Sequence, residues 1–207
     1  MSVEKAYNSW ANQYDTNINR TRDLDKKCTI ESLNKFEFKQ VIELGCGTGK
    51  NTKWLLNKAE RIIGLDFSQE MLSKAKLKIT DKRVRFKKAD INKDWDIESN
   101  FADLITSSLT LEHIKNLNPI FSQAQQKLKK NGLFFISELH PFKQYSGSKA
   151  RYENESGTKE LEVYIHHISE YMDAAKNNGF QFIELKEWFD ENLDNTIPRL
   201  ISFLFKV

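Results

Sequence analysis

The chain has 207 residues, of which 32 are basic and 29 are acidic, leaving a formal net charge of +3. This length suits one domain with a sizeable core, and the near balance of charge gives no overall argument for nucleic acid as a partner. Two cysteines make no disulfide framework, and no apolar run approaches the length of a membrane span. The N-terminal segment lacks an apolar signal region. We therefore expect a reducing, cytoplasmic location.

Helical and strand-like patterns alternate along most of the chain. The predicted helices cover 3–14, 22–35, 50–58, a segment beginning near Ser68, 117–130 and 168–178, with Asn131-Gly132 as the stop signal of the fifth. The predicted strands cover 39–44, 61–66, 83–88, 101–107, 133–137, 180–189 and 199–207. This alternation favours a parallel sheet with helices on both faces. Residues 140–160 are mostly small and polar, which is typical of a lid or a binding loop.

The most informative segment runs from Val41 to Gly49. Its sequence, VIELGCGTG, joins an apolar strand to three alternate glycines, and a helical pattern follows at once. Because glycine has no side chain, such a loop can lie flat against a nucleotide-like ligand. The second apolar run ends at Asp66, seventeen residues after Gly49, where a carboxylate can accept hydrogen bonds from ribose hydroxyls.

The spacing of these glycines disfavours a dinucleotide. The dinucleotide fingerprint G-x-G-x-x-G has a third glycine that opens the helix, and Lys50 occupies that place here. Pyrophosphate at the helix N-terminus is therefore less favoured than an adenosine that carries an amino-acid arm and no phosphates. In these features the segment resembles motif I of the class I S-adenosylmethionine (SAM)-dependent methyltransferases.

The resemblance covers residues 38–140 well and implies a fold. That fold is α/β: a three-layer α/β/α Rossmann-like methyltransferase fold with a mostly parallel seven-stranded sheet whose last strand is antiparallel. It also implies a single domain over 1–207, made of an N-terminal helical cap at 1–36, a cofactor-binding core at 38–140, an acceptor-recognition insertion at 140–167, and a C-terminal helix and strands at 168–207.

In open parallel sheets, ligands bind beyond the carboxyl ends of the strands. The resemblance implies that residues at these ends hold SAM and, after transfer, S-adenosylhomocysteine (SAH). The implied cofactor-binding residues are Tyr14, Arg22, Glu43, Gly45, Cys46, Gly47, Asp66, Phe67, Met71, Asp90, Ile91 and Ser107. Asp66 would bind the ribose hydroxyls, and Phe67 and Met71 would cover the adenine. Purely structural interpretations stay open, since Asp66 and Asp90 can cap helices and Phe67 and Met71 can belong to the core.

Methyl transfer requires an acceptor held in line and shielded from water, and a base only where the acceptor must lose a proton. His113, after the fourth strand, and His140, after the fifth, are the candidate bases, and a hydrogen-bonded rim histidine is the alternative for each. No paired spacing such as H-x-x-x-H appears, so no metal site is expected. Tyr145, Arg151 and Tyr152 are candidates for binding the acceptor, and an ordered surface loop is the alternative.

The sequence therefore predicts an enzyme that transfers methyl from SAM to a small-molecule acceptor at oxygen, nitrogen or carboxyl. The expected partner is that small molecule and not nucleic acid, with monomer and homodimer both open. One alternative is an RNA or tRNA methyltransferase, because eight basic residues lie between Lys74 and Lys88. A solvated helix face explains the same residues. The other alternative is a catalytically silent SAM-binding scaffold.

Overall fold

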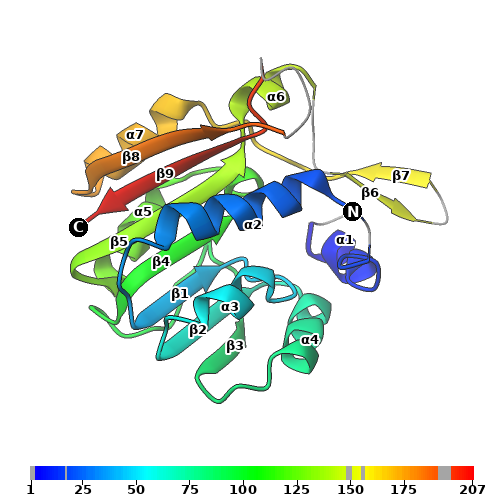
Figure 1. Ribbon diagram of the computed structural model, residues 1–207. Coiled ribbons are helices and arrows are strands. Elements are labelled where there is room, and N and C mark those ends of the chain that lie inside the picture. Colours follow the sequence, from blue (N-terminus) through cyan, green and yellow to red (C-terminus); the bar gives the residue numbers. More distant parts are fainter. Residues whose placement is uncertain (1–2, 17, 148–150, 155–156, 191–196) are drawn as a thin grey trace.

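A seven-stranded sheet organises the chain in the computed structural model, which describes residues 3–16, 18–147, 151–154, 157–190 and 197–207 (Figure 1). Its strands stand in the order β3-β2-β1-β4-β5-β9-β8. Their bounds are β1 Gln40–Leu44, β2 Arg61–Asp66, β3 Val84–Lys88, β4 Ala102–Ser108, β5 Leu128–Leu139, β8 Gln181–Trp188 and β9 Leu200–Lys206. β9 runs antiparallel to β5 and β8, and the first five strands pair in parallel. The predicted sheet, including its antiparallel last strand, is confirmed.

Helices cover both faces of the sheet and complete three layers. The α-helices are α1 Val3–Trp10, α2 Arg20–Leu33, α3 Lys50–Leu55, α4 Gln69–Lys78, α5 Asn118–Lys127, α6 Pro141–Tyr145 and α7 Ile168–Asn177, and η1 Leu111–His113 is a 3-10 turn. Phe134 and Ile136 pack into the cluster that contains α5 and α7, whereas Phe135 packs into the cluster that contains α2 and α3. Both faces of β5 are thus buried in its middle, which explains the apolar run of residues 133–136.

The helix predicted over 117–130 ends earlier than expected. α5 stops at Lys127, and β5 begins at Leu128, which pairs with Ala102 of β4. The Asn131-Gly132 signal lies inside the irregular start of β5, where Asn131 has a φ of 67°. Residues from Leu128 on, which the local pattern assigned to the helix, therefore belong to β5, because pairing between strands outweighs their helical preference.

The stretch at 140–160 contains more regular structure than its composition predicted. α6 forms directly after β5, and a two-stranded hairpin follows, made of β6 Arg151–Asn154 and β7 Gly157–Glu160. The hairpin stands apart from the main sheet, next to α1 (Figure 1). The described residues thus contain two strands beyond the predicted seven.

α1 is shorter than predicted, because residues 11–16 form turns after Trp10. It lies against α4, where Ser68 Oγ donates to Asn8 Oδ1 at 2.6 Å. On its other side Ala6 packs with Leu161, just beyond the hairpin. The first helix therefore spans from α4 to the segment that follows β7.

Candidate active site

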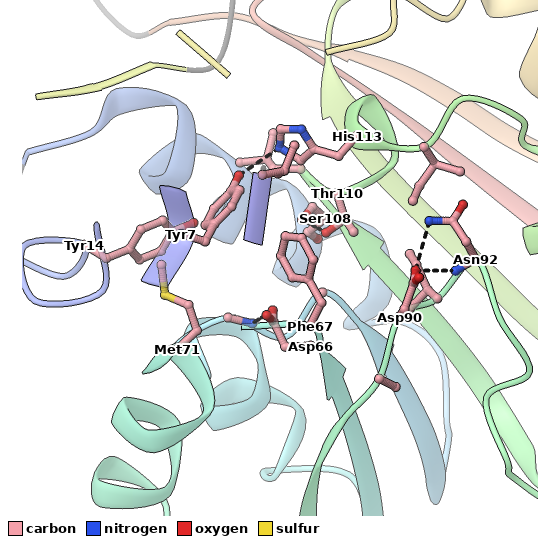
Figure 2. Close-up of a pocket in the computed structure, with 17 residues that line it drawn as sticks. Tyr7, Tyr14, Asp66, Phe67, Met71, Asp90, Asn92, Ser108, Thr110 and His113 are labelled. Carbon is pink, nitrogen blue, oxygen red and sulfur yellow. Dashed lines mark hydrogen bonds between the residues drawn. The ribbon is translucent and has the colours of Figure 1, made fainter. Parts of the chain in front are cut away.

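A cavity lies at the carboxyl ends of β1 to β4, under α1. Its empty volume is about 710 Å³, a figure that includes the open mouth. The cavity is lined by Val3, Tyr7, Tyr14, Gly45, Gly47, Asp66, Phe67, Met71, Ala89, Asp90, Ile91, Asn92, Ser108, Leu109, Thr110, His113 and Ile114 (Figure 2). The loops after four neighbouring strands thus meet in one place, as expected for a ligand site in an open α/β sheet.

The glycine loop after β1 forms one wall of the cavity. Gly45 has a φ of +67°, and a Cβ there would come 2.1 Å from Thr110 Oγ1, so only glycine fits between the loop and the turn after β4. Gly47 has a φ of +52°, and a Cβ there would meet no atom within 4 Å. Since Gly47 lines the cavity, its bare backbone leaves room there that any side chain would occupy.

Asp66 ends β2 at the floor of the cavity, where two backbone groups orient its carboxylate. Gly47 N donates to Oδ2 and Ser68 N donates to Oδ1, both at 2.8 Å. Burial raises the pKa of Asp66 to about 6, against the lowering effect of these hydrogen bonds. Each carboxylate oxygen has a second lone pair, so Asp66 can still accept hydrogen bonds from a ligand.

Solved structures share this architecture. An S-adenosylmethionine-dependent methyltransferase from Clostridium acetobutylicum aligns with a TM-score of 0.74 at 20% identity, covering 98% of this chain and 99% of that one. A DhpI–SAH complex aligns with a TM-score of 0.74 at 19% identity, covering 97% and 93% of the two chains.

Sequence comparison agrees with this architecture. A malonyl-[acyl-carrier protein] O-methyltransferase of Priestia megaterium is 30% identical over 143 residues, which are 65% of this chain and 50% of that protein. Residues 42–136 match the family model described as "Methyltransferase domain". The matched segment is thus similar to a methyltransferase domain, and nearly the whole chain shares the fold of SAM-dependent methyltransferases. These similarities support an enzyme that uses SAM as its cofactor.

Eight of the twelve predicted cofactor-binding residues of the methyltransferase line the cavity: Tyr14, Gly45, Gly47, Asp66, Phe67, Met71, Asp90 and Ile91. Phe67 and Met71 lie on either side of Asp66 in Figure 2. Asp90 Oδ1 accepts from the backbone and side-chain nitrogens of Asn92, both at 3.0 Å, which fixes the loop after β3. The structure brings these side chains together, and their roles toward SAM stay predictions.

The other four predicted cofactor residues lie behind the wall. Glu43 is buried, accepts from Thr52 Oγ1 at 2.5 Å, and has its pKa raised to about 8 by burial. Cys46 is buried with its N–H donating to Leu65 O, and the guanidinium of Arg22 lies 4.1 Å from the ring centroid of Tyr14. Ser107 is fully buried. These residues support the cavity wall.

The two candidate bases occupy different places. His113 lines the cavity and lies across it from Asp66 (Figure 2). His140 instead caps α6, where its Nδ1 accepts from Phe142 N at 3.1 Å and its Nε2 donates to Glu187 Oε1 at 3.0 Å. Burial lowers the pKa of His140, which stays in the structural role that the sequence left as the alternative.

Of the three predicted acceptor residues, Tyr145 has a described side chain, and it does not line the cavity. Tyr145 is exposed, and its hydroxyl bonds His167 Nδ1 at 2.6 Å. Arg151 and Tyr152 contribute backbone to β6, and their side chains lie outside the part of the chain that the structure describes. The acceptor role of all three therefore stays a prediction.

Sequence reasoning missed a group of lining residues on the side of the cavity away from the glycine loop. Tyr7 of α1 is the most informative of them, because its hydroxyl bonds His113 Nε2 at 2.9 Å. Tyr7 also packs against Phe67, Trp10 and Tyr14, with ring centroids 5.8 to 6.4 Å apart. The aromatic pattern of α1 was visible in the sequence, but it did not separate a covering helix from a cavity wall.

Glu138 sets the shape of the turn after β4. Its Oε1 accepts from the backbone nitrogens of Thr110 and Leu111 at 2.9 and 2.7 Å. Burial, reinforced by the neighbouring Glu112, raises the pKa of Glu138 to about 8.

Among the described residues, no helix is long and apolar enough to cross a membrane.

Proposed function

We propose that this methyltransferase acts on a small molecule that enters the cavity beside SAM. The observation that carries the proposal is the oriented carboxylate of Asp66, held by Gly47 N–H at the floor of a cavity that Gly47 keeps open. Asp66 would accept from the ribose hydroxyls, and Phe67 and Met71 would cover the adenine. SAM supplies an electrophilic methyl group on sulfur.

The chain's own residues would position the reactants and exclude water. The half-buried aromatic rings of Tyr7, Tyr14 and Phe67 form an apolar cover over the polar floor. Methyl transfer gains most from a fixed in-line approach and a dry site, and a rigid aromatic wall serves both.

The segment after the hairpin would close the acceptor side, in keeping with the predicted insertion at 140–167. Tyr164 N donates to Glu112 O at 2.7 Å, and Glu162 O lies 3.0 Å from His113 Nδ1. Leu161 packs on Ala6 of α1. Three parts of the chain that lie far apart in the sequence, α1, η1 and residues 161–164, thus contact one another at one end of the cavity.

The surface charges favour a small molecule over RNA. Four of the eight basic residues between positions 74 and 88 form ion pairs within the chain, namely Lys78–Asp15, Arg83–Asp81, Lys87–Asp96 and Lys88–Glu4. A carboxylate beside each of these cations weakens its attraction for phosphate. Lys88–Glu4 also fastens α1 over the cavity.

Calorimetric titration with SAM tests the cofactor part of the proposal. Wild-type protein should bind SAM, and Asp66→Ala should lose tight binding because the ribose loses its acceptor. Near-normal affinity of Asp66→Ala would contradict the assignment of this site. Incubation with methyl-labelled SAM and fractionated cell extract then tests the acceptor: label in small molecules supports the proposal, and label in RNA contradicts it.

A further inference from the structure

The hydrogen bond between Tyr7 and His113 joins two cavity-lining residues that stand 106 positions apart. His113 Nδ1 faces the backbone oxygen of Glu162 at 3.0 Å. A carbonyl oxygen can only accept, so the hydrogen of the neutral imidazole sits on Nδ1 and Nε2 is left with a lone pair. The Tyr7 hydroxyl must therefore donate to Nε2, and its own oxygen keeps lone pairs free to accept.

We propose that Tyr7 and His113 form a proton relay that takes the proton from a hydroxyl group of the methyl acceptor. This inference rests on the proposed function and narrows it to hydroxyl compounds. A carboxylate arrives without a proton at the attacking atom, so it would have no use for a base. A hydroxyl becomes strongly acidic only as its oxygen bonds to carbon, and a neutral imidazole then suffices to accept the proton.

The relay balances in protons and electrons. The acceptor oxygen forms a bond to the methyl carbon while the carbon–sulfur bond breaks and its electron pair goes to sulfur. The acceptor's proton passes to Tyr7 Oη as Tyr7's proton passes to His113 Nε2. Tyr7 ends as a neutral phenol, His113 ends as an imidazolium, and the Glu162 oxygen stabilises that cation through Nδ1–H.

The surroundings suit both groups for these roles. Burial lowers the pKa of His113, so its ring is neutral near pH 7 and can accept a proton. Burial raises the pKa of Tyr7 well above its ordinary value, so the phenol keeps its proton until the relay operates. The titratable side chains that act on Tyr7 are Tyr14, Asp66, Glu112 and Glu138, and Glu162 faces His113 through its backbone oxygen. All four further raise the pKa of Tyr7, Tyr14 most strongly.

A merely structural explanation is that the bond fastens α1 over the cavity. Tyr7→Phe separates the two explanations, because phenylalanine keeps the ring contacts with Phe67 and Trp10 and removes only the hydroxyl. Other contacts also hold α1, including Lys88–Glu4 at 2.8 Å and Ser68–Asn8 at 2.6 Å. Loss of the relay hydroxyl should therefore leave the docking of α1 and the binding of SAM intact.

The kinetic test compares Tyr7→Phe, His113→Gln and the double variant. Methyl-labelled SAM is supplied with a panel of phenols and enols and with carboxylic acids and amines of similar size. We expect transfer to hydroxyl compounds, about 100-fold slower in each single variant with no further loss in the double variant. The affinity for SAM should stay within about threefold, because a general base acts on the acceptor. Ser9→Ala, which removes an exposed hydroxyl bonded to Lys5 O on the same helix α1, is the control and should keep full activity.

A spectroscopic readout needs no acceptor. Nitrogen NMR of the His113 ring, assigned with His113→Gln, should show the hydrogen on Nδ1 in the wild type. In Tyr7→Phe the pKa of His113 should rise, because the neutral ring loses its donor at Nε2.

Several outcomes overturn the relay while leaving the proposed function standing: a hydrogen on Nε2, an unchanged His113 pKa in Tyr7→Phe, full activity of Tyr7→Phe, or transfer only to carboxylates or amines. The absence of transfer to any hydroxyl compound, in the panel and in extract, also counts against it. Failure of the wild type to bind SAM would instead overturn the proposed function.

Discussion

The two sides of the cavity are built in different ways. The side with the glycine loop and Asp66 comes from turns directly after β1 and β2, within 22 residues of the sequence from Gly45 to Asp66. The opposite side needs α1, η1 and residues 161–164, which lie far apart in the chain. The first side is a consequence of local backbone geometry, and the second depends on how distant segments dock. Local sequence changes should therefore act strongly on SAM binding, while the acceptor side should respond to changes in buried charge and packing.

The largest effect is expected on the glycine side. Gly47→Leu would place a side chain in the open space beside Asp66 and strain a backbone with a φ of +52°. We expect SAM affinity to fall by at least about 100-fold, measured by calorimetry. Gly179→Leu is the matched control, because Gly179 also has a positive φ (+75°) and open space around its Cβ but lies after α7. An equal loss of affinity in both variants would mean that strain, and not occupation of the cavity, is responsible.

The pH dependence of SAM binding should follow Asp66. The pKa of about 6 means that the carboxyl is mostly protonated at pH 5 and mostly ionised at pH 7, and only the ionised form is a full acceptor for two ribose hydroxyls. Affinity should therefore rise about tenfold between these pH values. Asp66→Asn should bind weakly and show a flat profile. A profile of the wild-type shape in that variant would assign the titration to another group.

A smaller effect is expected on the free energy of unfolding, from the buried carboxyl of Glu138 behind the turn after β4. The folded-state pKa of Glu138, about 8, lies above its ordinary value of 4.5, so folding retains a proton in that window which the unfolded chain releases. The contribution to stability is therefore greatest below pH 4.5 and is lost as the pH rises to about 8. Glu138→Gln removes the charge and keeps an oxygen acceptor for Thr110 N and Leu111 N.

Thermal unfolding measures this effect. Glu138→Gln should raise Tm by a few degrees at pH 8 and leave it nearly unchanged at pH 4.5, corresponding to about 1–2 kcal/mol. Exposed Glu98→Gln is the control and should show no such dependence. A lower Tm at pH 8 for Glu138→Gln would show that the charge on Glu138 stabilises the turn.

The smallest effect is expected from the eight basic residues between positions 74 and 88, none of which lines the cavity. Lys74→Gln, Lys76→Gln and Lys82→Gln together should leave methyl transfer unchanged at low and high salt. These three lysines lie outside the four ion pairs that tie down their neighbours. A collapse of activity that also falls steeply with salt would favour a nucleic-acid substrate.

Most of the fold could be predicted, because its signals are local. Short windows of sequence encode the apolar runs of β1, β2 and β4. They also encode the N-cap of α4, where Ser68 Oγ accepts from Met71 N. The end of α5 could not be predicted, because the pairing of Leu128 with Ala102 in the sheet competes with continuation of the helix. The hairpin at 151–160 has no alternating apolar pattern, so its composition gave no strand signal.

The sequence by itself determined the fold family, the glycine loop and the place of Asp66, because strand periodicity and glycine's access to positive φ act over a few residues. Only the tertiary structure decided that His113 faces the cavity, that His140 caps a helix, and that Tyr7 bonds His113. The bond between Tyr7 and His113 depends on the docking of α1, and a contact across 106 positions leaves no trace in a local pattern. The role of His140 depends on Glu187 of β8, 47 positions away.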